Sequence, residues 1–142
     1  MSDKFFLDTN IFAYAFDSSA VSKTKISDRL IRRGIQTGKG VVSYQVVQEF
    51  FNVAFKKFRL PLSEIEAENY FHSALRPMLG VFFSATLLLR AFGIREKHSI
   101  PWYDALILAA AIEGECEILY SEDFQHGMQI QGVRVQNPFL SN

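Results

Sequence analysis

The chain has 142 residues, of which 49% are hydrophobic and 14% aromatic, and fifteen basic residues balance fifteen acidic ones. That length predicts one domain spanning residues 1–142, and the composition excludes intrinsic disorder, which needs low hydrophobicity and a high net charge. A net charge of zero also excludes nucleic acid binding through the overall field of the protein, and a single cysteine, Cys116, excludes an internal disulfide framework.

Short apolar segments alternate with helical patterns along the whole chain. The first half predicts a strand at Lys4–Leu7, a helix over Ser22–Arg33 with a serine cap and Gly34 just past its end, a strand at Val41–Ser43 and a helix over Tyr44–Lys57. The second half predicts a helix from Pro61 to about His72, a strand at Met78–Phe83, helices over Ala85–Lys97 and Pro101–Glu113, and strands at Ile118–Tyr120 and Val133–Val135. This alternation predicts an α/β fold, a parallel sheet with helices on both faces.

The chain is expected to be cytoplasmic and free of any membrane attachment. Its charge-free apolar stretch Met78–Leu89 is shorter than the roughly 20 residues that a membrane-spanning helix needs. At the N-terminus, Asp8 interrupts what would otherwise be the apolar core of a signal peptide.

Four acidic residues have ordinary structural explanations when each is taken alone. Asp8 follows a strand and can cap the next helix, with Asn10 as a turn residue, while Asp104 lies near a helix N-terminus and is favoured there by the macrodipole. Glu49 lies at the border of the apolar face of its helix and can be a solvated edge residue. Asp123 follows a strand and can support a turn by local hydrogen bonds. These explanations stay open at this point.

The combination points to a metal site. Two of the acids follow strand ends, and the other two lie on helices that can pack against those ends, where α/β proteins bind ligands. Gathered carboxylates repel one another unless a cation neutralises them, and oxygen-only ligation is what Mg²⁺ or Mn²⁺ prefers. Such an ion commonly serves phosphate chemistry, so the residues predict metal-assisted phosphodiester hydrolysis.

Four pieces of the sequence stand in a characteristic order: FFLDTNIFAYAFD (5–17), SYQVVQEFFNV (43–53), WYDALILAAA (102–111) and ILYSEDFQHG (118–127). In this order they resemble the PIN domain, a small α/β ribonuclease fold, and within it the VapC-type toxins of prokaryotic toxin–antitoxin pairs. The resemblance implies a three-layer α/β/α fold with a central five-stranded parallel sheet. It also implies an endoribonuclease that depends on Mg²⁺ or Mn²⁺, forms a homodimer, and is held inactive by an antitoxin.

The resemblance also assigns roles to residues of this sequence. The four acidic positions of the family fall on Asp8, Glu49, Asp104 and Asp123, with Glu122 as a competitor for the fourth. Asn10 and Ser121 match the polar residues that support the acidic cluster. We expect Asp8, Asp104 and Asp123 to bind a metal ion, and Glu49 to bind a second ion or to orient the attacking water.

Contacts with RNA phosphates normally need lysine and arginine, and the neutral chain has only local clusters of them. The cluster of Lys56, Lys57 and Arg59 lies at the end of the Glu49 helix and is the candidate for contacts with RNA near the metal. Clusters of this kind are usually solvated helix faces, and that explanation also stays open.

The leading alternative is a catalytically silent PIN-like module that binds RNA or protein, although intact acids at all four positions count against it. A phosphoryl-acceptor receiver needs an aspartate after the central strand, where Ser84 and Ala85 stand, and a haloacid-dehalogenase-type phosphatase needs one at Asn10. Gly38 and Gly40 precede a strand instead of following one, which excludes a phosphate-binding P-loop.

Overall fold

The computed structural model describes residues 2–140, and its centre is a six-stranded sheet in the order β3-β2-β1-β4-β6-β5. The strands are β1 (Phe5–Leu7), β2 (Gly40–Ser43), β3 (Leu79–Val81), β4 (Ile118–Tyr120), β5 (Gln129–Ile130) and β6 (Val133–Gln136). All neighbouring pairs are parallel except β5 and β6, which are antiparallel. The five predicted parallel strands are therefore confirmed, and β5 adds a short sixth strand at one edge.

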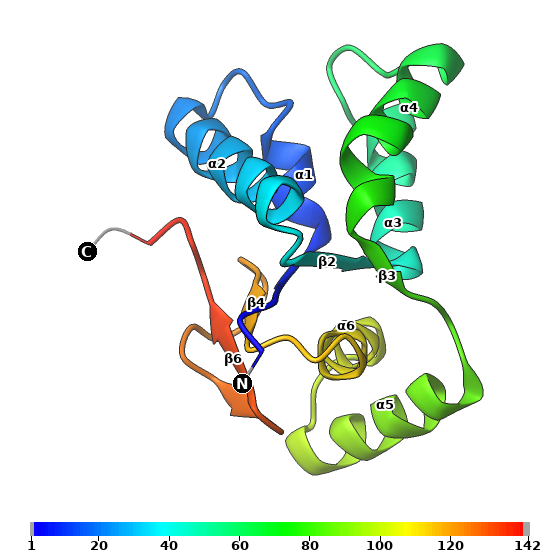
Figure 1. Ribbon diagram of the computed structural model, residues 1–142, viewed down its shortest axis with the longest axis vertical. Helices are drawn as coiled ribbons and strands as arrows, with labels where there is room; N and C mark the ends of the chain where they lie inside the picture. The colour runs from blue at the N-terminus through cyan, green and yellow to red at the C-terminus, as the bar shows by residue number, and fades with distance from the viewer. Residues whose placement is uncertain (1, 141–142) are drawn as a thin grey trace.

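Helices cover both faces of the sheet, as Figure 1 shows. One layer contains α1 (Thr9–Tyr14), α2 (Val21–Thr37), α3 (Tyr44–Lys56) and α4 (Glu64–Tyr70), and the chain continues from α4 through η1 (Phe71–Leu75) and η2 (Arg76–Met78). The opposite layer contains α5 (Ala85–His98) and α6 (Trp102–Glu113). The three-layer α/β/α prediction is confirmed.

Burial explains why the central elements are apolar throughout. All three residues of β1 are buried, because a central parallel strand is covered on both faces. In α6 every residue from Ala105 to Ala111 is buried, so this helix has no polar face along most of its length. The polar residues that remain near these elements stand at their ends, beyond the core.

Side-chain caps begin α3 and α4, whereas the predicted cap of α2 is absent. The hydroxyl of Ser43 accepts a hydrogen bond from the amide of Val46 at 3.3 Å and begins α3 directly after β2. Ser63 and Glu66 form a capping box that begins α4 at Glu64, later than the predicted start at Pro61. The predicted serine cap of α2 is wrong, because the residue that precedes this helix is Ala20 and no side chain caps it.

The prediction that α2 stops before Gly34 is also wrong, since Gly34 lies buried inside the helix. A Cβ atom at Gly34 would lie 2.7 Å from Met78 Sδ and 3.1 Å from Gly40 Cα. The missing side chain therefore lets α2 approach β2 closely. The helix ends at Gly38, whose φ of 69° is the left-handed conformation that favours glycine.

Strand β3 is shorter than the predicted segment Met78–Phe83. Phe82 and Phe83 leave the sheet and are 60% and 67% exposed. Within residues 2–140, none of the helices combines the length and the apolar character needed to cross a membrane.

Candidate active site

A groove of about 750 Å³ opens at the carboxyl ends of the central strands, and all four predicted acidic residues line it. Asp8 follows β1 and Asp123 follows β4, two strands that pair in parallel. Glu49 comes from α3, and Asp104 from the first turn of α6. The fold thus brings together carboxylates that are as far apart as residues 8 and 123 in the sequence.

Asp8 is buried and held by two hydrogen bonds. Its Oδ1 accepts from the amide of Thr9 at 2.7 Å, and its Oδ2 accepts from the hydroxyl of Ser121 at 2.7 Å. Asp8 also precedes α1 as its N-terminal cap, so the capping explanation is correct as far as it goes. Burial raises the pKa of Asp8 to about 6 against the two hydrogen bonds, and the charges of Asp123 and Glu49 contribute to this rise.

Ser121 links the two strand ends. It is fully buried, donates to Asp8, and accepts a hydrogen bond from the amide of Asp123 at 3.1 Å. Ser121, which was expected to support the acidic cluster, therefore fixes the segments that carry Asp8 and Asp123 relative to each other.

Glu49 is linked to Asp8 through Thr9. Its Oε1 accepts a hydrogen bond from the hydroxyl of Thr9 at 3.2 Å, while the amide of Thr9 donates to Asp8. Thr9 therefore couples two of the four acids through one residue, although nothing in the sequence marked it for this contact.

Asp104 and Asp123 have no side-chain hydrogen bond or ion pair with any residue in the described part of the chain. Burial and the charge of Asp123 raise the pKa of Asp104. Burial and the neighbouring Glu122 raise the pKa of Asp123. Both carboxylates are thus available to a cation and are destabilised in its absence.

Glu122 also lines the groove, but its two oxygens are occupied. Its Oε1 accepts from the hydroxyl of Tyr14 at 2.6 Å, and its Oε2 pairs with Lys23 Nζ at 2.6 Å. Burial alone would raise the pKa of Glu122, yet these bonds outweigh it and hold the pKa below the usual value. Of the two competing acids after β4, Asp123 is the one left free.

The donor set fits Mg²⁺ or Mn²⁺ bound with several waters. It consists of carboxylate oxygens and the buried amide oxygen of Asn10, which has no hydrogen-bond partner among the described residues and lies in the groove wall. Across residues 2–140, no three His, Cys, Asp or Glu side chains gather tightly enough to enclose an ion by themselves. Such an open arrangement suits an ion that keeps much of its water shell and uses one or two direct carboxylates.

The sequence profile of the PIN domain matches residues 5–126. The chain belongs to the PIN domain family. A search of curated protein sequences finds no significant match.

Solved structures with the same fold include a toxin–antitoxin complex from Klebsiella pneumoniae, with a TM-score of 0.68 at 20% identity, covering 96% of this chain and 98% of that one. The VapC20 toxin of Mycobacterium tuberculosis, described as cleaving the sarcin-ricin loop, has a TM-score of 0.61 at 18% identity over 84% of this chain and 90% of its own. The VapBC2 complex of Rickettsia felis, bound to promoter DNA, has a TM-score of 0.61 at 18% identity, with 93% and 96% covered. The fold of this PIN domain is thus that of VapC-type toxins.

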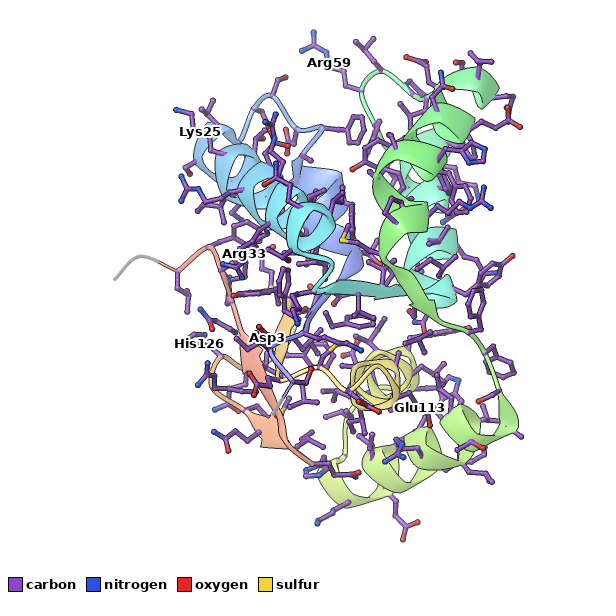
Figure 2. All side chains as sticks on the ribbon, in the orientation of Figure 1. Asp3, Lys25, Arg33, Arg59, Glu113 and His126 are labelled. Atoms are coloured by element: carbon purple, nitrogen blue, oxygen red, sulfur yellow. The ribbon has the colours of Figure 1, made fainter. Side chains whose placement is uncertain are left out.

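The basic residues predicted to contact RNA lie outside the acidic groove of the PIN domain. Lys57 and Arg59 line a neighbouring hollow of about 770 Å³, which shares Ala13 and Val53 with the groove, and Lys56 is exposed beside them. Figure 2 shows Arg59 directed outward from the loop that follows α3. These residues are therefore next to the groove without lining it.

Several groove residues of the PIN domain were not predicted. Gln45, Gln48 and Asn52 line the groove with Glu49 at the spacing of one helical stripe on α3, so the periodicity of this helix contained the signal. Tyr103 lines the groove beside Asp104, and its carbonyl accepts from Gln45 Nε2 at 3.4 Å.

Proposed function

We propose that this PIN domain is a divalent-metal-dependent endoribonuclease and the toxin of a toxin–antitoxin pair. The single observation that carries the nuclease proposal is that Asp8, Glu49, Asp104 and Asp123, from four separate elements, line one groove. The fold shared with VapC toxins and toxin–antitoxin complexes supports the biological role. We assign the activity to a single domain acting on RNA in the cytoplasm.

Asp8, Asp104 and Asp123 are the residues assigned to hold the ion. When bound, Mg²⁺ or Mn²⁺ would polarise the phosphodiester and lower the pKa of a water molecule. Ser121 and Thr9 keep Asp8 in one orientation, since both of its oxygens accept hydrogen bonds. We assign Glu49, which accepts a hydrogen bond from Thr9, to orient the attacking water or to take part in holding a second ion.

The RNA strand is proposed to pass from the acidic groove toward the hollow lined by Lys57 and Arg59. The two depressions share part of their walls, so one strand can occupy both. In this arrangement the metal neutralises the phosphate in the groove, and Lys56, Lys57 and Arg59 neutralise phosphates beside it. The antitoxin is the second proposed partner, in keeping with the complexes that share the fold.

A homodimer is proposed through an apolar surface beside the groove. Tyr44, Phe82, Phe83 and Tyr103 line a hollow of about 420 Å³ and are between 46% and 67% exposed. Exposed apolar patches of this kind mark interfaces.

Phe83→Ser is expected to shift the protein from dimer to monomer in light scattering after gel filtration. Leu60→Ser, at a residue that is 82% exposed outside this surface, is the control and should leave the dimer intact.

An RNA cleavage assay tests the proposed activity. The wild-type protein should cut single-stranded or structured RNA with Mg²⁺ or Mn²⁺ and lose the activity in EDTA. Asp8→Asn and Asp104→Asn should each reduce the rate at least about a hundredfold. Glu68→Gln, at an exposed acid outside the groove, is the matched control and should cut normally.

Undiminished cleavage by either aspartate variant would remove that residue from the mechanism. Wild-type protein that binds RNA but leaves it uncut at every metal concentration would support the alternative, a catalytically silent binding module.

A further inference from the structure

Lys23 is part of a network at the edge of the acidic groove that the proposed mechanism does not use. Its Nζ pairs with Glu122 Oε2 at 2.6 Å and donates to the hydroxyl of Tyr14 at 3.1 Å, while that hydroxyl donates to Glu122 Oε1 at 2.6 Å. The ammonium also lies 4.5 Å from the centre of the Tyr14 ring and 5.4 Å from that of Phe139. These contacts hold Lys23 from several directions.

The network joins distant parts of the chain. Lys23 lies on α2, Tyr14 on α1, and Glu122 in the turn after β4. Among the described residues, Lys23 is the one basic residue that forms an ion pair with a residue lining the groove. The groove wall itself contains no lysine or arginine.

Glu122 and Asp123 are consecutive, and both line the groove, but only Glu122 is compensated. With Lys23 in place, both Glu122 oxygens accept hydrogen bonds, and the ammonium lies 2.6 Å from one of them. Without Lys23, Glu122 would add a further uncompensated carboxylate beside the proposed metal ligands, and a nearby negative charge strengthens the binding of a divalent cation.

We propose that Lys23 is a positioning residue that withholds Glu122 from the metal, so that the divalent ion is left to Asp8, Asp104 and Asp123. This inference rests on the proposed metal site and goes beyond it, because it assigns control of metal affinity to a residue outside the groove. Tyr14 assists by holding the second oxygen of Glu122. The groove therefore binds a divalent ion more weakly than it would if Glu122 were also free to bind it.

The experiment is a calorimetric titration of the full chain with Mn²⁺ alone, without RNA. Lys23→Met is expected to bind Mn²⁺ roughly three- to tenfold more tightly than wild type at low salt, because it releases one carboxylate and removes one positive charge. A purely structural role for Lys23 predicts the opposite direction, since a loosened groove would bind the ion more weakly.

Three further variants isolate the cause. Lys25→Met removes the same charge from an exposed residue of α2 that makes no hydrogen bond or ion pair with the other described residues, and Figure 2 shows it on the outer side of that helix. Lys25→Met and Lys23→Arg should both bind Mn²⁺ within about twofold of wild type. In the double variant Lys23→Met with Glu122→Gln, the gain in affinity should disappear.

The outcomes separate this inference from the proposed function. Equal or weaker Mn²⁺ binding by Lys23→Met, or a gain that survives in the double variant, overturns the role of Lys23 and leaves the metal site standing. Absence of Mn²⁺ binding by the wild-type chain at millimolar concentration overturns both.

Discussion

Asp8 differs from Asp104 and Asp123 in how its carboxylate is held in the acidic groove. Asp8 is buried, and both of its oxygens accept hydrogen bonds, from Thr9 and from Ser121. Asp104 and Asp123 are less buried, and their carboxylates accept no hydrogen bond from the described residues. Asp8 therefore has a structural role as well as its proposed chemical one, whereas the carboxylates of Asp104 and Asp123 have no partner among residues 2–140.

This difference shows how the metal-free protein tolerates several carboxylates gathered in one groove. The cost of collecting carboxylates is partly offset at Asp8 by two hydrogen bonds and at Glu122 by an ion pair. It is left uncompensated at Asp104 and Asp123, the positions assigned to the ion. Substitutions of Asp8 and of Asp104 should therefore affect stability and metal binding differently.

The largest expected effect of the contrast concerns the pH dependence of stability. The folded-state pKa of Asp8, about 6, lies above its usual value of 3.8, so the folded protein binds this proton more tightly than the unfolded chain. As the pH rises from about 4 to 6, ionisation of Asp8 therefore lowers the free energy of unfolding by up to about 3 kcal/mol. This loss of stability persists above pH 6. Asp8→Asn should remove this loss.

The measurement is urea unfolding of both proteins in EDTA at pH 4.5 and pH 7.5. Asparagine keeps an acceptor for the amide of Thr9, and its Nδ2 can donate to the hydroxyl of Ser121, so the variant should be no less stable than wild type at pH 7.5. A variant that is clearly less stable at pH 7.5 would contradict the conclusion that the buried charge of Asp8 destabilises the folded protein at that pH.

The next effect in size concerns Ser121, which links Asp8 to the segment that carries Asp123. Ser121→Ala removes the donor to Asp8 and the acceptor for the amide of Asp123, so the free energy of unfolding should fall by about 1–3 kcal/mol and Mn²⁺ affinity by about ten- to a hundredfold. Ser27→Ala is the matched control, because Ser27 is equally buried but its hydroxyl has no partner among the described residues. That change should be neutral or slightly stabilising, and equal effects of both changes would remove the special role of Ser121.

The smallest expected effect on stability is at Asp104. Asp104→Asn should change the free energy of unfolding of the metal-free protein by less than about 0.5 kcal/mol, because no described residue depends on its carboxylate. It should nevertheless abolish most of the increase in melting temperature that Mn²⁺ gives to the wild-type protein, since that increase follows metal binding. An unchanged increase would show that Asp104 does not hold the ion.

Local signals in the sequence were sufficient to predict most of the fold. Ser43 and the Ser63–Glu66 capping box set helix starts through contacts within four residues, and the five parallel strands are short segments that contain apolar residues. Gly34 misled the prediction because its role depends on contact with Gly40 and not on helix termination. The two-residue strand β5 is too short for any periodic signal.

The candidate site was predictable to the extent that its acids follow strand ends or begin helices. Asp8, Asp104 and Asp123 occupy such positions, and Glu49 shares a polar stripe with neighbouring amides on α3. The contacts that orient these acids were not predictable from pattern alone. The bond between Thr9 and Glu49, and the ion pair between Lys23 and Glu122, join residues far apart in the sequence with no local signature.

The most direct test of the proposed metal site is a crystal of the protein soaked with Mn²⁺, in which anomalous scattering locates the ion. We expect a strong anomalous peak inside the groove, in contact with at least one of Asp8, Asp104 and Asp123 either directly or through water. A crystal saturated with Mn²⁺ that shows no peak in the groove, or shows its strongest peak at another acidic surface, would contradict it.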